Sequence, residues 1–144
     1  MKLAVIGAGS SYTPELLGGL FERLDTIPVT EICLMDADTA RLEINADFAQ
    51  RMAQQAGAEI AVHPTPEVRD AVRDARYVVT QIRVGQMQAR IEDERLGLRH
   101  HTIGQETTGV GGFACALRTI PRVLDIAHAM EELAPEGFLI NFTN

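Results

Sequence analysis

Two glycines that directly follow the first apolar segment have the clearest chemical potential in this sequence. Gly7 and Gly9 come immediately after residues 2–6. A glycine at the first position allows a tight turn, and a glycine at the second lets the backbone approach a pyrophosphate that binds the N–H groups of the next helix. Tyr12 stands where the usual G-x-G-x-x-G pattern has its third glycine, which argues against tight packing of that helix on the strand. The segment is typical of a dinucleotide-binding turn.

A carboxylate at the end of the second apolar segment would complete such a site. Asp36 follows residues 31–35, where a carboxylate can accept hydrogen bonds from both hydroxyls of an adenosine ribose. It would also repel the 2′-phosphate of NADP, so the sequence favours NAD. The alternative is that Gly7 and Gly9 form an ordinary turn and that Asp36 caps a helix.

The apolar patterns around these residues predict alternating strands and helices. We expect strands at residues 2–6, 31–35, 60–63, 77–80 and 138–142. We expect helices at about 13–24, 39–56, 67–73, 86–96 and 113–133, with Thr13 as the N-cap of the first, a turn at 64–66 and a loop at 104–112. This alternation predicts an α/β fold, a doubly wound parallel sheet of the Rossmann type with helices on both faces.

Composition limits the classes of partner. The formal charge of -7 argues against a nucleic acid or an anionic membrane, because phosphate groups would be repelled overall. No segment reaches the roughly 18 apolar residues of a membrane span, and no signal peptide is evident. Cys33 and Cys115 match no metal or redox spacing, so we expect two buried thiols in the cytoplasm.

Four segments, in order along the whole chain, resemble the family 4 glycoside hydrolases. They are GAGSSYTPE (7–15), QIRVG (81–85), GQET (104–107) with Gly109, Gly111 and Gly112 behind it, and NFTN (141–144). In this family a tyrosine normally replaces the third glycine. The 6-phospho-β-glucosidase branch is the most similar, mainly through SSYTP (10–14) and QAR (88–90).

The resemblance implies an unusual glycosidase mechanism that does not use the common pair of carboxylates. NAD⁺ takes hydride from C3 of the sugar, and a tyrosine assisted by a divalent metal, expected to be Mn²⁺, removes the acidified C2 proton. The aglycone is eliminated, water adds, and the hydride returns. The family's catalytic tyrosine and its metal ligands lie beyond its Asn-Pro motif, so we expect no metal ligand within this chain.

The resemblance also assigns roles to individual residues. The cofactor would be bound by Gly7, Gly9, Ser10, Ser11, Tyr12, Thr13, Asp36 and Arg83, and Arg83 could also line the phosphate of the substrate. Arg90 would contact the phosphorylated sugar, Asn144 would bind the sugar near the nicotinamide, and Glu106 would raise the basicity of the absent tyrosine. The alternatives are an ion pair of Arg90 with Glu94 or Asp93, a helix cap at Asn144, a solvated Glu106 and a surface charge at Arg83. A metal site at His100 and His101 is not expected, because adjacent residues seldom face one ion.

We therefore expect residues 1–144 to form the N-terminal NAD-binding domain of a longer 6-phospho-β-glucosidase, with the chain truncated after its fifth strand. The substrate would be a phosphorylated disaccharide or glucoside, and the full-length enzyme a homo-oligomer. The alternatives are another family 4 glycosidase, acting on an α-glucoside or a galacturonide, and the NAD domain of a lactate- or malate-type dehydrogenase. A third alternative is a nucleotide-binding or assembly module without catalysis.

Overall fold

A parallel five-stranded sheet forms the centre of the computed structural model, which describes residues 1–143. Its strands are β1 (Lys2–Ile6), β2 (Glu31–Met35), β3 (Ala61–Thr65), β4 (Tyr77–Thr80) and β5 (Phe138–Asn141). They lie in the order β3-β2-β1-β4-β5, and every neighbouring pair is parallel. The strand order reverses between β1 and β4, so the predicted doubly wound fold is confirmed, and its switch point lies at the carboxyl ends of these two strands.

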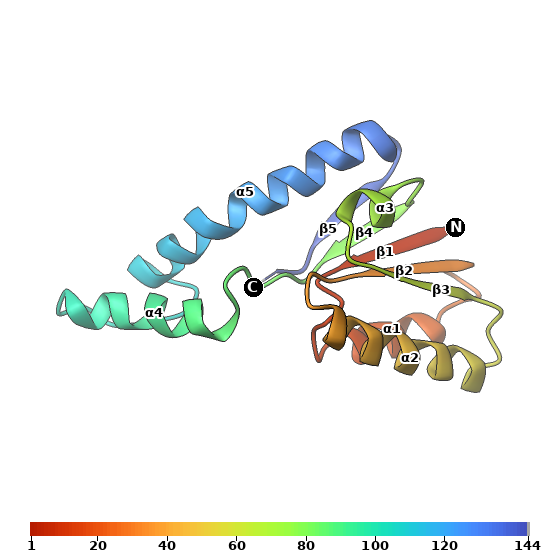
Figure 1. Cartoon of the computed structure of the whole chain (residues 1–144), viewed down its shortest axis with the longest axis horizontal. Coiled ribbons are helices and arrows are strands. Elements are labelled where there is room, and N and C mark those ends of the chain that lie inside the picture. Colours follow the sequence, from red (N-terminus) through yellow and green to blue (C-terminus); the bar gives the residue numbers. More distant parts are fainter. Residues whose placement is uncertain (144) are drawn as a thin grey trace.

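Helices cover both faces of the sheet, as Figure 1 shows. The five helices of the described chain are α1 (Thr13–Phe21), α2 (Thr39–Gln55), α3 (Val68–Val72), α4 (Gln86–Arg99) and α5 (Gly109–Leu133), and all but α4 pack on the sheet. On one face, Leu17 of α1 and Leu42 of α2 pack with the strands in one apolar cluster. On the other, Val72 of α3 and Ile126 of α5 belong to a second cluster. Burial on both sides explains why the inner strands are continuous apolar runs.

Helix α4 and the first half of α5 extend beyond the carboxyl edge of the sheet (Figure 1). We call residues 86–120 the helical arm. Glycines allow its two helices to pack closely. A Cβ atom at Gly111 would collide with the carbonyl oxygen of Gln105 and would lie 2.9 Å from that of Asp93.

Several predicted boundaries were wrong. Helix α4 ends at Arg99 and not near residue 96, and three other differences have a physical reason. Helix α1 ends at Phe21, because the chain turns there and Leu24 reaches the first apolar cluster from the turn. Strand β3 runs to Thr65 through the predicted turn, since an edge strand tolerates Pro64 where no ladder hydrogen bond is needed. Helix α5 begins at Gly109, inside the predicted loop, because its glycine-rich first turn packs against α4.

The cysteines only partly match the prediction. Cys33 of β2 is buried, whereas Cys115 of α5 is only half-buried, with its Sγ atom 3.8 Å from Thr119 Oγ1. Burial raises the pKa of the Cys33 thiol, because the thiolate would lose its hydration. Within residues 1–143, no helix is long and apolar enough to cross a bilayer.

Candidate functional site

The turn after β1 has the geometry that its glycines predict. Gly7 adopts a φ of 92°, in the region that favours glycine. A Cβ atom there would lie 2.7 Å from the carbonyl oxygen of Gln81, which follows β4. The N–H groups of Gly7 and Ala8 both donate to the Met35 carbonyl, at 2.9 and 2.8 Å. The turn is thus fixed between the ends of β4 and β2, at the switch point of the sheet.

Asp36 at the end of β2 is attached directly to the glycine turn. Its Oδ2 atom accepts the Gly9 N–H at 2.7 Å, and its Oδ1 atom accepts the Asp38 N–H at 2.9 Å. A Cβ atom at Gly9 would lie 2.8 Å from Oδ2 and 3.2 Å from Cβ of Arg41. Gly9 is therefore needed for the approach of Asp36 and α2, a reason that the sequence did not reveal. The helix cap is Asp38, which accepts the Arg41 N–H, and not Asp36.

Helix α1 begins differently from the prediction. Tyr12, not Thr13, is the N-cap, and its side chain is exposed outside the turn. Thr13 is fully buried, and its hydroxyl donates to the Ala8 carbonyl at 2.9 Å. Leu17, one turn further on, is also fully buried. The expected loss of close packing at Tyr12 is therefore wrong, because its side chain points away from the sheet.

Two amides that sequence reasoning missed hold this turn. Asn45 Nδ2 of α2 donates to the carbonyls of Ala8 and Ser10, at 2.6 and 3.0 Å. Gln81 Nε2 donates to Thr13 Oγ1 at 2.6 Å. Asn45 lies four residues before Ala49 on the buried stripe of α2, so a polar residue in an apolar stripe was the available signal. Of the remaining turn residues, Ser10 Oγ accepts the Tyr12 N–H, and Ser11 is exposed.

Three residues with different predicted roles come together at the base of the helical arm: Arg83 for the cofactor, Arg90 for the phosphorylated sugar and Glu106 for the absent tyrosine. Arg83 Nη1 donates to Glu106 Oε1, and Arg90 Nη2 lies 2.9 Å from Glu106 Oε2. Arg90 Nε also donates to Glu94 Oε1 at 3.0 Å, so the intrahelical pair expected as the alternative is present as well. The hydrogen bond to Glu94, and then the charge of Glu106, raise the pKa of Arg90. We call Arg83, Arg90, Glu94 and Glu106 the arginine–glutamate cluster.

A second ion pair joins the segments that carry this cluster. Arg118 of α5 forms two hydrogen bonds with the buried Asp93 carboxylate of α4, at 3.1 and 2.6 Å. Its Nε atom donates to the Val84 carbonyl at 2.8 Å, in the loop that contains Arg83. Sequence reasoning considered Asp93 only as a partner of Arg90 and missed Arg118, because residues 25 positions apart leave no local pattern.

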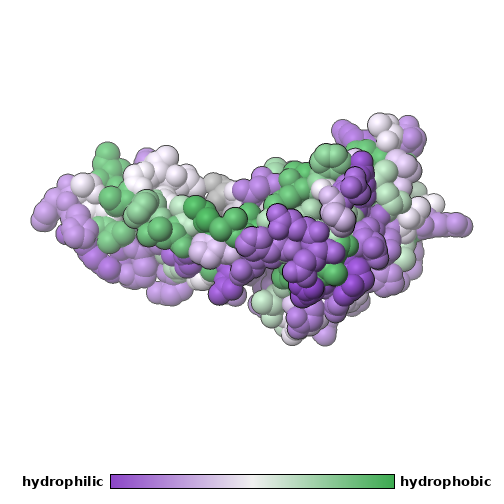
Figure 2. Space-filling view, turned by 90° about the horizontal axis from the view of Figure 1, so that it is seen from above, coloured by the Kyte–Doolittle hydropathy of each residue, from purple (hydrophilic) through white to green (hydrophobic). Residues whose placement is uncertain are grey.

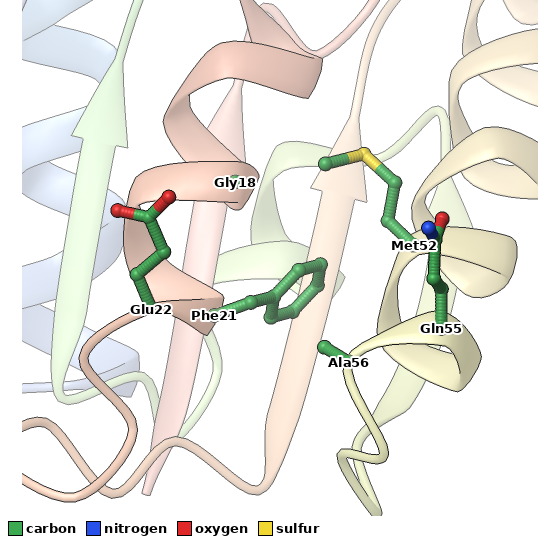
Figure 3. Close-up of a pocket in the computed structure, with 6 residues that line it drawn as sticks. All are labelled: Gly18, Phe21, Glu22, Met52, Gln55 and Ala56. Carbon is green, nitrogen blue, oxygen red and sulfur yellow. The ribbon is translucent and has the colours of Figure 1, made fainter.

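Other predicted site residues contribute less. Asn144 lies outside the described residues; just before it, Thr80 Oγ1 donates to Asn141 Oδ1 at 2.7 Å and Ile82 N–H to Thr143 Oγ1 at 3.2 Å. No group of three or more His, Cys, Asp or Glu residues within 1–143 could hold a metal ion. A hollow between α1 and α2, lined by Gly18, Phe21, Glu22, Met52, Gln55 and Ala56, is shown in Figure 3. It lies at the other end of α1 from the glycine turn, so it is no part of this site.

Comparison with known proteins identifies the family. The profile of family 4 glycosyl hydrolases matches residues 2–144. The chain belongs to this family. It is 47% identical to the 6-phospho-beta-glucosidase of Escherichia coli K12, over all of this chain and 32% of that protein. The structure of the 6-phospho-beta glucosidase from Thermotoga maritima, with NAD and glucose-6-phosphate, matches with a TM-score of 0.93 at 39% identity, over 100% of this chain and 34% of that chain.

Similarity to dehydrogenases is confined to the fold. Malate dehydrogenase from Salinibacter ruber matches with a TM-score of 0.63 at 17% identity, over 100% of this chain and 37% of that one. The family 4 chain thus has the sheet of a dehydrogenase, whereas its sequence is that of a glycosidase family. It spans about a third of the length of the family relatives that it matches.

Proposed function

We propose that residues 1–144 are the N-terminal NAD-binding domain of an NAD- and divalent-metal-dependent 6-phospho-β-glucosidase. The substrate is a phosphorylated glucoside or disaccharide, and the metal, Mn²⁺, is bound by residues beyond this chain. The protein acts in the cytoplasm as a homo-oligomer. Membership of the family over residues 2–144, with 47% identity to a 6-phospho-beta-glucosidase, is the observation that carries this proposal.

The glycine turn and Asp36 suit NAD. The turn leads into the N-terminus of α1, where the helix dipole favours a pyrophosphate. The Gly9 N–H donates to Asp36 and the Ser10 N–H to the Gly7 carbonyl, so the Ser11 N–H and the two serine hydroxyls are the donors that the turn offers. Both Asp36 oxygens accept one backbone hydrogen bond each and keep lone pairs for the hydroxyls of a ribose. The buried Gln81 Oε1 has no partner among the described residues, which leaves an unused acceptor beside the turn. Bound NAD⁺ supplies a hydride acceptor, and these residues orient it.

The arginine–glutamate cluster suits the phosphorylated end of the substrate. Arg83 and Arg90 offer two guanidinium groups at one place, and a guanidinium matches phosphate oxygens in charge and geometry. Asn144 then binds the sugar near the nicotinamide. Glu106 acts on the tyrosine of the remaining chain, although both of its oxygens pair with arginines in the structure described here. Its negative charge can raise the basicity of that tyrosine fully only when Glu106 separates from the two arginines.

The test uses a fusion in which this chain replaces the N-terminal third of the Escherichia coli enzyme, the part that it matches. We expect the fusion to release a chromogenic aglycone from a 6-phospho-β-glucoside, and to need NAD⁺ and Mn²⁺. The unphosphorylated β-glucoside should be a poor substrate. The 144-residue chain alone should be inactive, since the tyrosine and the metal ligands are missing. Hydrolysis of the α-anomer in preference to the β-anomer would contradict the proposal.

A variant of the same fusion tests Arg90. Arg90→Ala should lower kcat/KM for the phosphorylated substrate. The decrease should correspond to a loss of roughly 2–5 kcal/mol of transition-state stabilisation for a contact shielded from water. Arg95→Ala is the matched control, because Arg95 lies on the same helix and pairs with Glu92 on its exposed side. If both variants fold correctly and have equal kinetics, Arg90 does not bind the substrate and serves only in its ion pair with Glu94.

A further inference from the structure

The carboxylate of Glu106 lies between two arginines from different segments. Arg83 belongs to the loop after β4, and Arg90 belongs to α4. Each arginine takes a different oxygen of Glu106, Arg83 the Oε1 atom and Arg90 the Oε2 atom, the latter at 2.9 Å. The two oxygens therefore occupy the position in which an anion would bridge the guanidinium groups.

Exposure distinguishes this bridge from an ordinary surface ion pair. The Glu106 side chain is only 19% exposed, whereas those of Arg83 and Arg90 are 34% and 35% exposed. Solvent-borne anions can thus reach the guanidinium groups at a place where Glu106 is already bound. Glu94 and Glu106 together balance the two positive charges, and release of Glu106 would leave one net positive charge in the cluster. A phosphate monoester, with a charge of about −2 at neutral pH, brings more negative charge to the guanidinium groups than the single carboxylate that it replaces.

We propose that Glu106 is an internal counter-ion for the substrate's phosphate ester, which binds Arg83 and Arg90 by displacing the Glu106 carboxylate. The inference rests on the proposed function, because it places the phosphate at this cluster. A neutral sugar has no group that can compete with the carboxylate, so the exchange favours phosphorylated ligands. Phosphate can bind only when Glu106 has left the arginines, and the free energy of that release lowers the apparent affinity for phosphate.

The test removes the competing charge and leaves both arginines in place. Glu106→Gln in the 144-residue chain should bind glucose 6-phosphate and inorganic phosphate about tenfold more tightly than the unaltered chain, by calorimetry at low salt. Glucose should bind neither protein measurably. Glu92→Gln is the matched control, because Glu92 also bridges two arginines, Arg95 and Arg99, but on the exposed side of α4. Its phosphate affinity should change less than twofold.

Weaker or unchanged phosphate binding by folded Glu106→Gln would overturn the inference, and so would an equal gain in Glu92→Gln. If Glu106→Gln does not fold, NMR titration of the unaltered chain with glucose 6-phosphate tests the inference instead. Glucose 6-phosphate should shift the Arg83 and Arg90 Nε–H signals, and should move the Glu106 carboxyl-carbon signal toward that of a solvated glutamate. A Glu106 signal that stays in place while both arginine signals shift would also overturn it. In that case Arg90-dependent glucose 6-phosphate binding would still support the proposed function.

Discussion

Arg118 and Asp93 form a two-point ion pair, at 2.6 and 3.1 Å, that fastens α5 to α4 at the base of the helical arm. The Asp93 side chain is 7% exposed and that of Arg118 is 29% exposed. Breaking a buried pair leaves an uncompensated charge, which costs about 3–5 kcal/mol in comparable sites. Arg118→Met should therefore destabilise the arm, with a loss toward the lower end of that range because Arg118 retains some solvent.

Denaturant unfolding, with hydrogen exchange of the arm's amides, measures this loss. Arg122→Met is the matched control, since Arg122 pairs with Asp125 at 3.0 Å on the same helix, but both side chains are more than 60% exposed. The control should change the free energy of unfolding by less than about 1 kcal/mol. Equal losses in the two variants would show that the Asp93 pair does not hold the arm.

Gly9→Ala should disrupt the cofactor site and leave the sheet folded. The added Cβ atom would lie 2.8 Å from Asp36 Oδ2, so the carboxylate must leave the turn. We expect at least about tenfold weaker NAD⁺ binding, equivalent to roughly 1.4 kcal/mol. Gly19→Ala is the control, because its Cβ atom would have no neighbour closer than 3.9 Å. Normal NAD⁺ affinity in folded Gly9→Ala would remove the link between Gly9, Asp36 and the cofactor.

Burial of Cys33 predicts a loss of stability at alkaline pH. The pKa of its thiol is raised in the folded protein above the ordinary value, mainly because burial removes the thiolate from water. A raised pKa favours folding below the unfolded-state pKa, and this contribution disappears as pH rises toward the folded-state pKa. The free energy of unfolding should fall above a pH of about 8.5, and Cys33→Ala should abolish that part of the fall. Cys115→Ala should retain it; the same slope in both variants would contradict the assignment.

The exposed apolar stripe of α5 predicts self-association of the 144-residue chain. Val110, Phe113, Leu117, Ile120 and Leu124 follow one another at intervals of three and four residues, and all are exposed. Figure 2 shows this apolar surface along the arm, viewed onto α5. Helical stripes of this spacing normally pack against another element. Sedimentation should show concentration-dependent association that Leu117→Glu reduces, whereas Ile44→Glu, at an exposed position on α2 outside this stripe, should not reduce it.

The sequence predicted those parts of the fold whose signal is local. Strands β1, β2 and β4 have the expected bounds, because each is an apolar run with neighbours on both sides. Strand β3 was misplaced because an edge strand with exposed His63 and Pro64 has no such run. The first turn of α5 looked like a loop, since its glycines serve contacts with α4 that only the tertiary structure reveals.

In the candidate site, too, only the residues with a local signal were predicted. Gly7, Gly9 and Asp36 follow strands, so topology brings them together. The family resemblance singled out Arg83, Arg90 and Glu106 separately, but their meeting was not predicted, because 23 residues separate Arg83 from Glu106. The contacts of Arg118 and Gln81 were not predicted, since their partners lie 25 and 68 residues away.

The most direct test of the central claim, that this chain is a domain specific for NAD, is calorimetric titration of the 144-residue chain with NAD⁺ and with NADP⁺. Asp36 should make NAD⁺ the tighter ligand, because a carboxylate at this position can accept hydrogen bonds from ribose hydroxyls and would repel a 2′-phosphate. Asp36→Ala should weaken NAD⁺ binding by about 1–3 kcal/mol and reduce the preference for NAD⁺. Asp38→Ala, which removes only the cap of α2, serves as the control and should leave the preference intact. NADP⁺ binding as tight as NAD⁺ binding, or no binding of either by the folded chain, would contradict the claim.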